Sequence, residues 1–250
     1  MSGHSKWSTI KNKKARTDEK KGKEYTRIAK EIILAAKSGG GDPEANSKLR
    51  LAVQQAKAVN MPNDNITRAI KKGTGEIASE VIEEINYEGY AAGGVAILLD
   101  IATDNRNRTA SDIRHLFSKF GGNLGESGCV SYLFDRVGLI TVSREDIKMD
   151  EEEFMLMVIE LGADDVREEE ETLEIITNPD NFMEVKESLE KTIKIEEADI
   201  VMLPQMTVEI TDEAVAARIL KLIDALEDHD DVQNLYSNVS IPDELLEKLI

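Results

Sequence analysis

The chain changes character near Gly75, and the change in charge and hydrophobic period divides it into differently built parts. Residues 1–75 contain 17 Lys and Arg against 7 Asp and Glu, a net charge of +10. The other 175 residues contain 14 against 42, or −28, so the whole chain carries −18. Exposed charges are screened over roughly 8 Å at physiological salt, so a phosphate backbone would meet the local +10. The first part is therefore a candidate nucleic-acid surface, and a solvated basic face without a partner is the alternative.

Three helices are predicted in the basic part, behind an arm at residues 5–23 that has too little apolar surface to fold alone. The first helix has an apolar stripe at helical spacing, made of Tyr25, Ile28, Ile32 and Ile33. Asp42 and Pro43 are typical of the N-cap and first position of a second helix, which is expected to bury Leu49, Val53 and Ala56. The third helix is short, ends at Gly73 and is expected to turn Ile66, Ala69 and Ile70 inward.

After Gly75 the hydrophobic pattern is that of an α/β protein. Residues 81–90 and 95–103 are expected to form a hairpin across Ala91-Ala92-Gly93-Gly94. A helix follows, predicted to start with a capping box at Thr109 to Asp112 and to end at Gly121-Gly122. Residues 129–134 are then expected to return as a strand.

Residues 136–204 alternate as strand, helix, hairpin, helix and strand, which is the ferredoxin-like order. Their 7 basic and 21 acidic residues give this segment a charge of −14. Strands at 206–210 and 232–239 are expected to complete the sheet begun before residue 136. The predicted fold class is multi-domain α/β (α+β), with an N-terminal helical domain followed by two α/β domains. The domains are a basic arm plus helical domain at 1–78, a central α/β domain at 79–135 and 205–250, and an acidic ferredoxin-like domain at 136–204 inserted in the central one.

The sequence offers little material for catalysis. The three histidines are not at metal-ligand spacing from one another or near Cys129, which leaves neither a nucleophilic triad nor a zinc site. Gly125 to Cys129 approximates a nucleophile elbow but precedes a predicted strand instead of a helix. The acidic runs Glu168 to Glu171 and Asp228 to Asp231 are expected to be solvated, with a bound hard cation as the alternative. We therefore predict a non-enzymatic protein without cofactor or metal.

Composition also limits the compartment. No apolar run approaches the roughly 20 residues that span a bilayer, and charges follow Trp7 where a signal peptide would be apolar. The single cysteine excludes an internal disulfide and fits a reducing cytosol. A cytoplasmic protein without a membrane partner is expected.

Two segments are candidates for direct contact with nucleic acid. Trp7, the only tryptophan, lies among the cations of the arm and can stack on a base, or alternatively anchor the arm on the helical domain. The loop from Thr103 to Thr109 places Arg106 and Arg108 at a helix N-terminus, which favours an anion. Pairing of these arginines with neighbouring acids between domains is the alternative. The predicted nucleic-acid-binding residues are Lys6, Trp7, Lys11, Lys13, Lys14, Arg16, Lys20, Lys21, Lys23, Arg27, Arg68, Lys71, Lys72, Arg106 and Arg108.

The same segments resemble the signatures of the YebC family. The matching stretches are Gly3 to Trp7, Ile10-Lys11, Gly40 to Pro43, Asn60-Met61-Pro62, Arg68-Ala69-Ile70, Thr103 to Thr109 and Gly121 to Gly125. The chain departs at Ala91-Ala92, where the family commonly has Gly-Pro, which affects only the expected shape of that turn. The resemblance runs nearly end to end and implies three domains around a cavity, one helical and two α/β, without enzyme activity.

The resemblance also implies a role in gene expression. Bacterial members are described as DNA-binding transcriptional regulators. Some members are linked to translation, including relief of ribosomes stalled at prolines. The mitochondrial relative is a translational activator of a cytochrome oxidase subunit. The prediction is a non-enzymatic regulator that binds DNA or ribosomal RNA through residues 1–75. A transcriptional regulator is placed first, although no helix-turn-helix recognition helix can be identified. A ribosome-associated translation factor, binding ribosomal or transfer RNA through the basic N-terminal region, explains the charge distribution at least as well.

Overall fold

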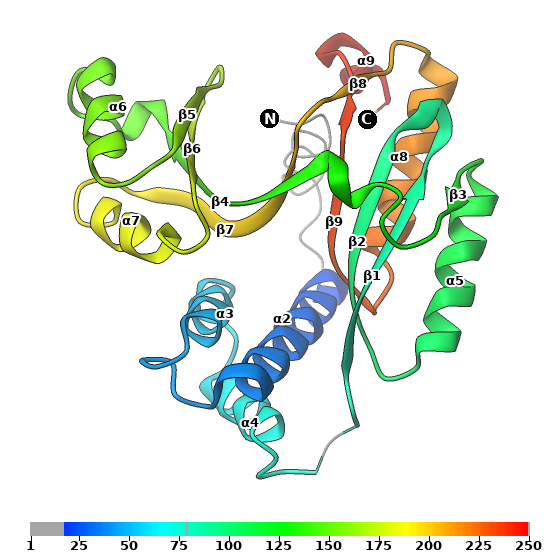
Figure 1. Ribbon diagram of the computed structural model, residues 1–250, viewed down its shortest axis with the longest axis horizontal. Helices are drawn as coiled ribbons and strands as arrows, with labels where there is room; N and C mark the ends of the chain where they lie inside the picture. The colour runs from blue at the N-terminus through cyan, green and yellow to red at the C-terminus, as the bar shows by residue number, and fades with distance from the viewer. Residues whose placement is uncertain (1–17, 79, 250) are drawn as a thin grey trace. The chain divides into compact units, whose positions relative to one another are not determined.

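The computed structural model describes residues 18–78 and 80–249, with side chains from residue 22 onward (Figure 1). The described residues divide into two compact units. One combines the chain up to Leu133 with the segment from Met206 onward, and the other comprises Phe134–Gln205. No helix in this described part is long and apolar enough to cross a membrane.

Three helices, drawn blue to cyan in Figure 1, form the N-terminal part of the first unit. They are α2 (Asp18–Gly39), α3 (Ser47–Ala58) and α4 (Asn63–Gly73), and both α3 and α4 pack on α2. The predicted apolar stripe is confirmed, since Ile28, Ile32 and Ile33 are buried. A Cβ at Gly73 would lie 2.5 Å from the Ile33 carbonyl oxygen, so glycine permits α4 to approach α2 this closely.

The second helix begins later than predicted. Asp42 and Pro43 lie in a turn, and the N-cap of α3 is Asn46, whose Oδ1 accepts the Leu49 N–H at 3.1 Å. The buried Asn46 amide also donates to the carbonyl oxygens of Ala35 and Gly40, both at 2.9 Å. A side chain that satisfies backbone groups of two helices outweighs the local preference of Asp-Pro for a helix start.

The predicted arm also ends earlier than expected. Residues 18–23 belong to α2, so helix replaces the predicted unstructured arm over that stretch. Residues 1–17, which carry the rest of the predicted arm, lie outside the described residues.

An antiparallel sheet of order β3-β1-β2-β9 forms the centre of the first unit. Its strands are β1 (Glu83–Tyr90), β2 (Ala96–Thr103), β3 (Asn123–Leu124) and β9 (Val232–Ser237). The predicted hairpin is confirmed, and its turn is the short 3-10 helix η1 (Ala92–Gly94), in which Gly93 and Gly94 have φ of 72° and 77°. Helices α5 (Arg106–Lys119) and α8 (Glu213–Glu227) pack against each other and on this sheet, burying Ile113, Phe117 and Leu222 in its core.

Three sequence expectations in this unit were wrong. α5 begins before the predicted capping box, because the N-cap is Asn105, whose side-chain oxygen accepts the Arg108 N–H at 3.1 Å. Thr109, the predicted cap, is instead buried within the helix. Residues 129–133 form a loop and the 3-10 helix η2 (Ser131–Leu133) instead of a strand, and only Phe134 belongs to a strand, as the first residue of one that continues into the second unit. The segment after residue 205 contributes β9 to the main sheet, but β8 (Val208–Glu209) pairs in parallel with β10 (Val239–Ser240) in a separate sheet, before the terminal helix α9 (Asp243–Leu249).

The second unit has the β-α-β-β-α-β order that the sequence predicts. Its elements are β4 (Phe134–Ser143), the 3-10 helix η3 (Arg144–Asp146), α6 (Glu151–Glu160), β5 (Asp165–Glu168), β6 (Thr172–Thr177), α7 (Phe182–Leu189) and β7 (Ile195–Pro204). The strands form an antiparallel sheet of order β5-β6-β4-β7. Phe154 from α6 and Phe182 from α7 are fully buried, so each helix contributes to this unit's core.

Candidate nucleic-acid interface

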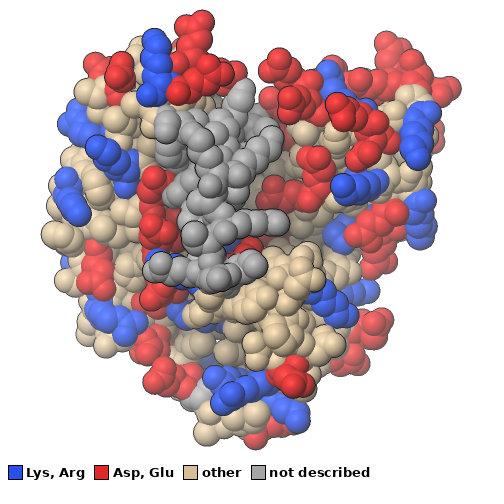
Figure 2. Space-filling view, turned by 180° about the vertical axis from the view of Figure 1, so that it is seen from behind, with Lys and Arg blue, Asp and Glu red and all other residues tan. Residues whose placement is uncertain are grey.

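The predicted contact residues fall into three groups. Lys6, Trp7, Lys11, Lys13, Lys14 and Arg16 lie outside the described residues, and Lys20 and Lys21 are placed on α2 without a description of their side chains. Lys23 and Arg27 lie on α2, and Arg68, Lys71 and Lys72 lie on α4. Arg106 and Arg108 lie in the first turn of α5. On the face shown in Figure 2, basic side chains are interspersed with acidic ones, so individual contacts decide which cations are available.

Four of the predicted contact residues on α2 and α4 have no side-chain partner among the described residues. Arg27, Arg68 and Lys71 are exposed, and Lys72 is half-buried. Lys23 differs, since its Nζ donates to the Asp228 carbonyl oxygen at 3.1 Å. A cation without a carboxylate partner can meet a phosphate without breaking an existing ion pair, so these four remain available among the predicted contact residues.

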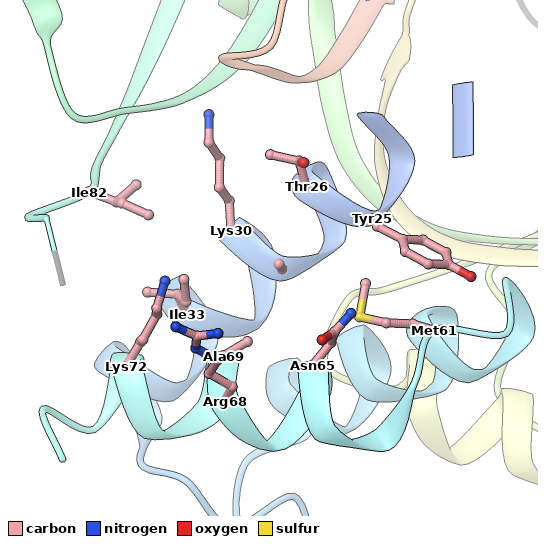
Figure 3. Close-up of a pocket in the computed structure, with 11 residues that line it drawn as sticks. Tyr25, Thr26, Lys30, Ile33, Met61, Asn65, Arg68, Ala69, Lys72 and Ile82 are labelled. Atoms are coloured by element: carbon pink, nitrogen blue, oxygen red, sulfur yellow. The ribbon is translucent and has the colours of Figure 1, made fainter. Parts of the chain in front are cut away.

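A pocket of about 370 Å³ lies between α2 and α4 (Figure 3). Its lining is mostly apolar, and the side chains of Arg68 and Lys72 reach from α4 toward α2. The lining residues are Tyr25, Thr26, Ala29, Lys30, Ile33, Met61, Asn65, Arg68, Ala69, Lys72 and Ile82. The pocket therefore combines apolar walls with two cations that have no ion pair with any residue the structure describes.

Lys30, which also lines this pocket, is fixed by a buried carboxylate. Its Nζ lies 2.9 Å from Asp231 Oδ1 and donates to the carbonyl oxygens of Ala102 and Asp230 at 3.0 and 2.8 Å. Asp231 Oδ2 in turn accepts hydrogen bonds from the Thr109 hydroxyl group at 2.7 Å and from the Arg108 guanidinium at 2.9 Å. The Thr103 hydroxyl group donates to the same Oδ2 at 3.2 Å. We call Asp231, Lys30, Arg108, Thr103 and Thr109 the Asp231 cluster. It connects α2 to β2, α5 and the start of β9.

Asp231 stays ionised although it is only 5% exposed. Burial raises the pKa of its carboxyl group, but hydrogen bonds from Lys30, Thr109 and Arg108 more than offset this and hold the pKa well below its usual range. The expectation that Asp228 to Asp231 is a solvated run was therefore wrong for Asp231. The sequence shows only that Lys30 lies off the apolar stripe, and its partner is 201 residues away.

The two arginines at the start of α5 have different surroundings. The Arg108 guanidinium lies 2.8 Å from Asp104 and 2.9 Å from Asp231, and both carboxylates raise the pKa of Arg108. Pairing with acids, the alternative considered from the sequence, is therefore what the structure shows for Arg108, but both acids belong to the predicted central domain, as Arg108 does, so the pairing does not join two domains. Arg106 is exposed and its guanidinium has no ion pair with any described residue.

The loop that approximates a nucleophile elbow is built around Glu88. This buried carboxylate accepts the N–H groups of Gly128, Val130 and Ser131 at 2.7, 2.7 and 2.8 Å. Burial raises the pKa of Glu88, but these backbone hydrogen bonds lower it overall. Burial, followed by the charge of Glu88, raises the pKa of the Cys129 thiol, so the thiolate that a nucleophilic cysteine needs is disfavoured. Within the described residues, no three His, Cys, Asp or Glu gather closely enough to hold a metal ion.

The chain matches two family models that together span most of its length. Residues 5–76 match the TACO1/YebC protein N-terminal domain, and residues 82–239 match the TACO1/YebC second and third domain. This division coincides with the change of composition near Gly75.

Full-length relatives give the same result. A protein from Syntrophomonas wolfei, named "Probable transcriptional regulatory protein", is 67% identical over 251 residues and covers 100% of both chains. A protein of the same name from Natranaerobius thermophilus is 55% identical over 99% of each chain. The crystal structure of a conserved hypothetical protein from Aquifex aeolicus is 51% identical, with a TM-score of 0.82 over 92% of this chain and 94% of that one. By sequence and by fold, this chain belongs to the TACO1/YebC family.

Proposed function

We propose that this chain is a non-enzymatic regulator of gene expression that binds nucleic acid through residues 1–75. The observation that carries the proposal is the separation of charge, +10 in this segment against −28 in the rest. Exposed cations without partners, Arg27, Arg68 and Lys71, supply phosphate contacts within the described part. The names of the relatives support the regulatory role. The proposal includes a cytoplasmic location and no cofactor or metal.

Within this proposal, a DNA-binding transcriptional regulator is the first candidate. It rests on the names of the relatives from Syntrophomonas wolfei and Natranaerobius thermophilus. A transcriptional regulator must read base edges, since phosphate contacts give affinity without sequence preference.

A ribosome-associated translation factor is the second candidate, and the packing of the helices favours it. In a helix-turn-helix unit, two helices joined by a short turn pair with each other, and the second enters the major groove. Here α3 and α4 are joined by residues 59–62, but each packs on α2 rather than on the other. Cations on helices that, within the described residues, do not form such a unit suit a folded RNA, which is read largely through its shape and its phosphates.

A competition experiment separates the two candidates. Labelled protein is offered a selected promoter fragment, random DNA and purified ribosomes in one buffer. A transcriptional regulator must prefer its operator by roughly a thousandfold or more, because a genome offers many competing sites. We expect weak discrimination between the DNAs and saturable, stoichiometric binding to ribosomes. Promoter DNA that outcompetes random DNA by more than about a hundredfold, with poor competition by ribosomes, would leave only the transcriptional candidate.

A second experiment tests the role of the first residues in binding. If roughly four to six phosphates of duplex DNA are neutralised, log K falls with log salt at a slope of about −4 to −5. Replacing Lys11, Lys13 and Lys14 together is expected to flatten this slope, whereas Trp7→Ala is expected to weaken binding with little change in it. Unchanged affinity and slope in the triple variant would remove the arm from the proposal.

A further inference from the structure

The pocket between α2 and α4 has the size and lining of a site for one nucleotide. Its volume of about 370 Å³ is near the lower end of the roughly 300–1,000 Å³ of small-molecule sites. Ala29, Ile33, Met61, Ala69 and Ile82 supply apolar walls. The aliphatic stem of Lys30 extends this wall, because its Nζ is held by Asp231.

An aromatic ring lies at one end of this pocket (Figure 3). The Tyr25 hydroxyl group donates to the carbonyl oxygen of Asn60 at 2.9 Å and lies 3.3 Å from that of Val59. These contacts tie the ring to the connection between α3 and α4. A ring fixed in this way loses little conformational entropy when a flat base stacks on it.

Polar groups without partners stand at the α4 side of the pocket. Among the described residues, neither the Arg68 guanidinium nor the Lys72 ammonium has an ion pair. The Asn65 amide is exposed and likewise has no side-chain hydrogen bond there. Its donor and acceptor can pair with two adjacent atoms of a base edge, as Asn does with adenine. The two cations, one turn apart on α4, suit a phosphate.

From this arrangement we propose that the pocket receives one unstacked base of a single-stranded nucleic acid, with its phosphate on Arg68 and Lys72. The inference rests on the proposed function and names the ligand form that this function uses. Bases inside a duplex are stacked and paired, so a pocket of this kind selects single strands, loops or bulges. An apolar peptide side chain fits the walls but leaves both cations without a counter-charge.

Three variants of the full chain test this proposal with a labelled 12-nucleotide RNA and its duplex as probes. Ala29→Leu fills the pocket from α2, and Ala29→Ser is its matched control because it leaves the pocket open. Asn65→Ala removes the amide, and Lys72→Ala removes one cation. Lys57→Ala is the charge-matched control for Lys72→Ala, since Lys57 is exposed in the last turn of α3 and does not line the pocket.

The wild type is expected to bind the single strand more tightly than the duplex at equal salt. Ala29→Leu is expected to weaken single-strand binding about tenfold, the size of one lost stacked base, with an unchanged salt slope. Asn65→Ala and Lys72→Ala are each expected to lower the affinity several-fold, and Lys57→Ala to lower it less. The melting temperature of each variant shows whether it folds. If Ala29→Leu does not fold, the single-strand affinities of Asn65→Ala, at an exposed residue, and of Lys72→Ala against Lys57→Ala test the proposal.

Two results would overturn the proposal. If the wild type binds both probes with a steep salt dependence while Ala29→Leu, Asn65→Ala and Lys72→Ala match their controls, the pocket is not a base site and the proposed function stands. If the wild type binds neither probe nor ribosomes, the proposed function and the base site fall together.

Discussion

The Asp231 cluster and the rim of the α2–α4 pocket use the same kinds of side chain for opposite purposes. Lys30 and Arg108 are both held by Asp231, which is 5% exposed. Arg68 and Lys72 have no such partner among the described residues. A cation whose charge is already balanced inside the fold stabilises the fold, whereas one without a partner keeps its charge for a ligand. The comparison teaches that the location of carboxylates decides which of the Lys and Arg side chains keep a charge that a ligand can meet.

Removing the Asp231 carboxylate is expected to have the largest effect on stability. Asp231→Asn keeps the shape of the side chain but leaves the Lys30 ammonium facing a neutral group. Breaking a buried ion pair in this way lowers the free energy of unfolding by about 3 kcal/mol. For a chain of this size the melting temperature should fall by roughly 6–12 °C, measured by circular dichroism. Asp230→Asn is the matched control, since Asp230 is exposed, and should change stability by less than about 0.5 kcal/mol. If the two variants melt alike, the cluster is not a stabilising centre.

Acid is expected to weaken the same cluster without a mutation. The folded-state pKa of Asp231 lies below its value of about 3.9 in the unfolded chain, so its contribution is complete above about pH 4. That contribution is lost as the pH falls further toward the folded-state pKa. Glu88, whose pKa is also lowered, adds to the loss in both proteins. Urea unfolding at pH 7, 5, 4 and 3 should therefore show the stability difference between wild type and Asp231→Asn narrowing below pH 4. A difference that widens instead would contradict the assigned direction of the shift.

Arg106 and Arg108 provide a comparison on one helical turn. Arg108→Ala should lower the melting temperature, though less than Asp231→Asn, because it leaves Asp231 with Lys30 and Thr109. Arg106→Ala should leave the melting temperature unchanged and weaken nucleic-acid binding. Thermal melts and anisotropy titrations of both single variants check this. Equal melting temperatures in the two variants, with equal losses of binding, would mean that the ion pairs of Arg108 have no structural role.

Local signals in the sequence predicted most of the fold. Apolar stripes such as Ile28, Ile32 and Ile33 located the helices, and the Gly93-Gly94 turn located the central hairpin. The errors arose where a distant group outweighed the local preference. Asn46 replaced Asp42 as a helix cap because it bonds to two carbonyl groups of the preceding helix region.

The candidate site was less predictable for the same reason. The sequence proposed Arg68, Lys72, Arg106 and Arg108 on equal terms, because each is a cation in a basic or anion-binding context. Only the fold brings Asp231 to Lys30 and Arg108, across separations of 201 and 123 residues. The pocket was also missed, because Tyr25, Met61 and Ala69 look in the sequence like ordinary core residues.

The role of the unpaired cations is tested most directly by the salt dependence of nucleic-acid affinity in two triple variants of equal charge. One replaces Arg27, Arg68 and Lys71 with Gln, and the other replaces Arg114, Lys194 and Lys221, which are also exposed, with Gln. Anisotropy titrations with the labelled nucleic acid that the wild type binds most tightly give the slope of log K against log salt. We expect the first variant to reduce this slope by roughly 2 to 3, at about 0.7–0.9 for each lost phosphate contact, and the second to leave it unchanged. Equal slopes in both variants would show that binding follows net charge alone and would contradict the claim that the unpaired cations of residues 1–75 form the interface.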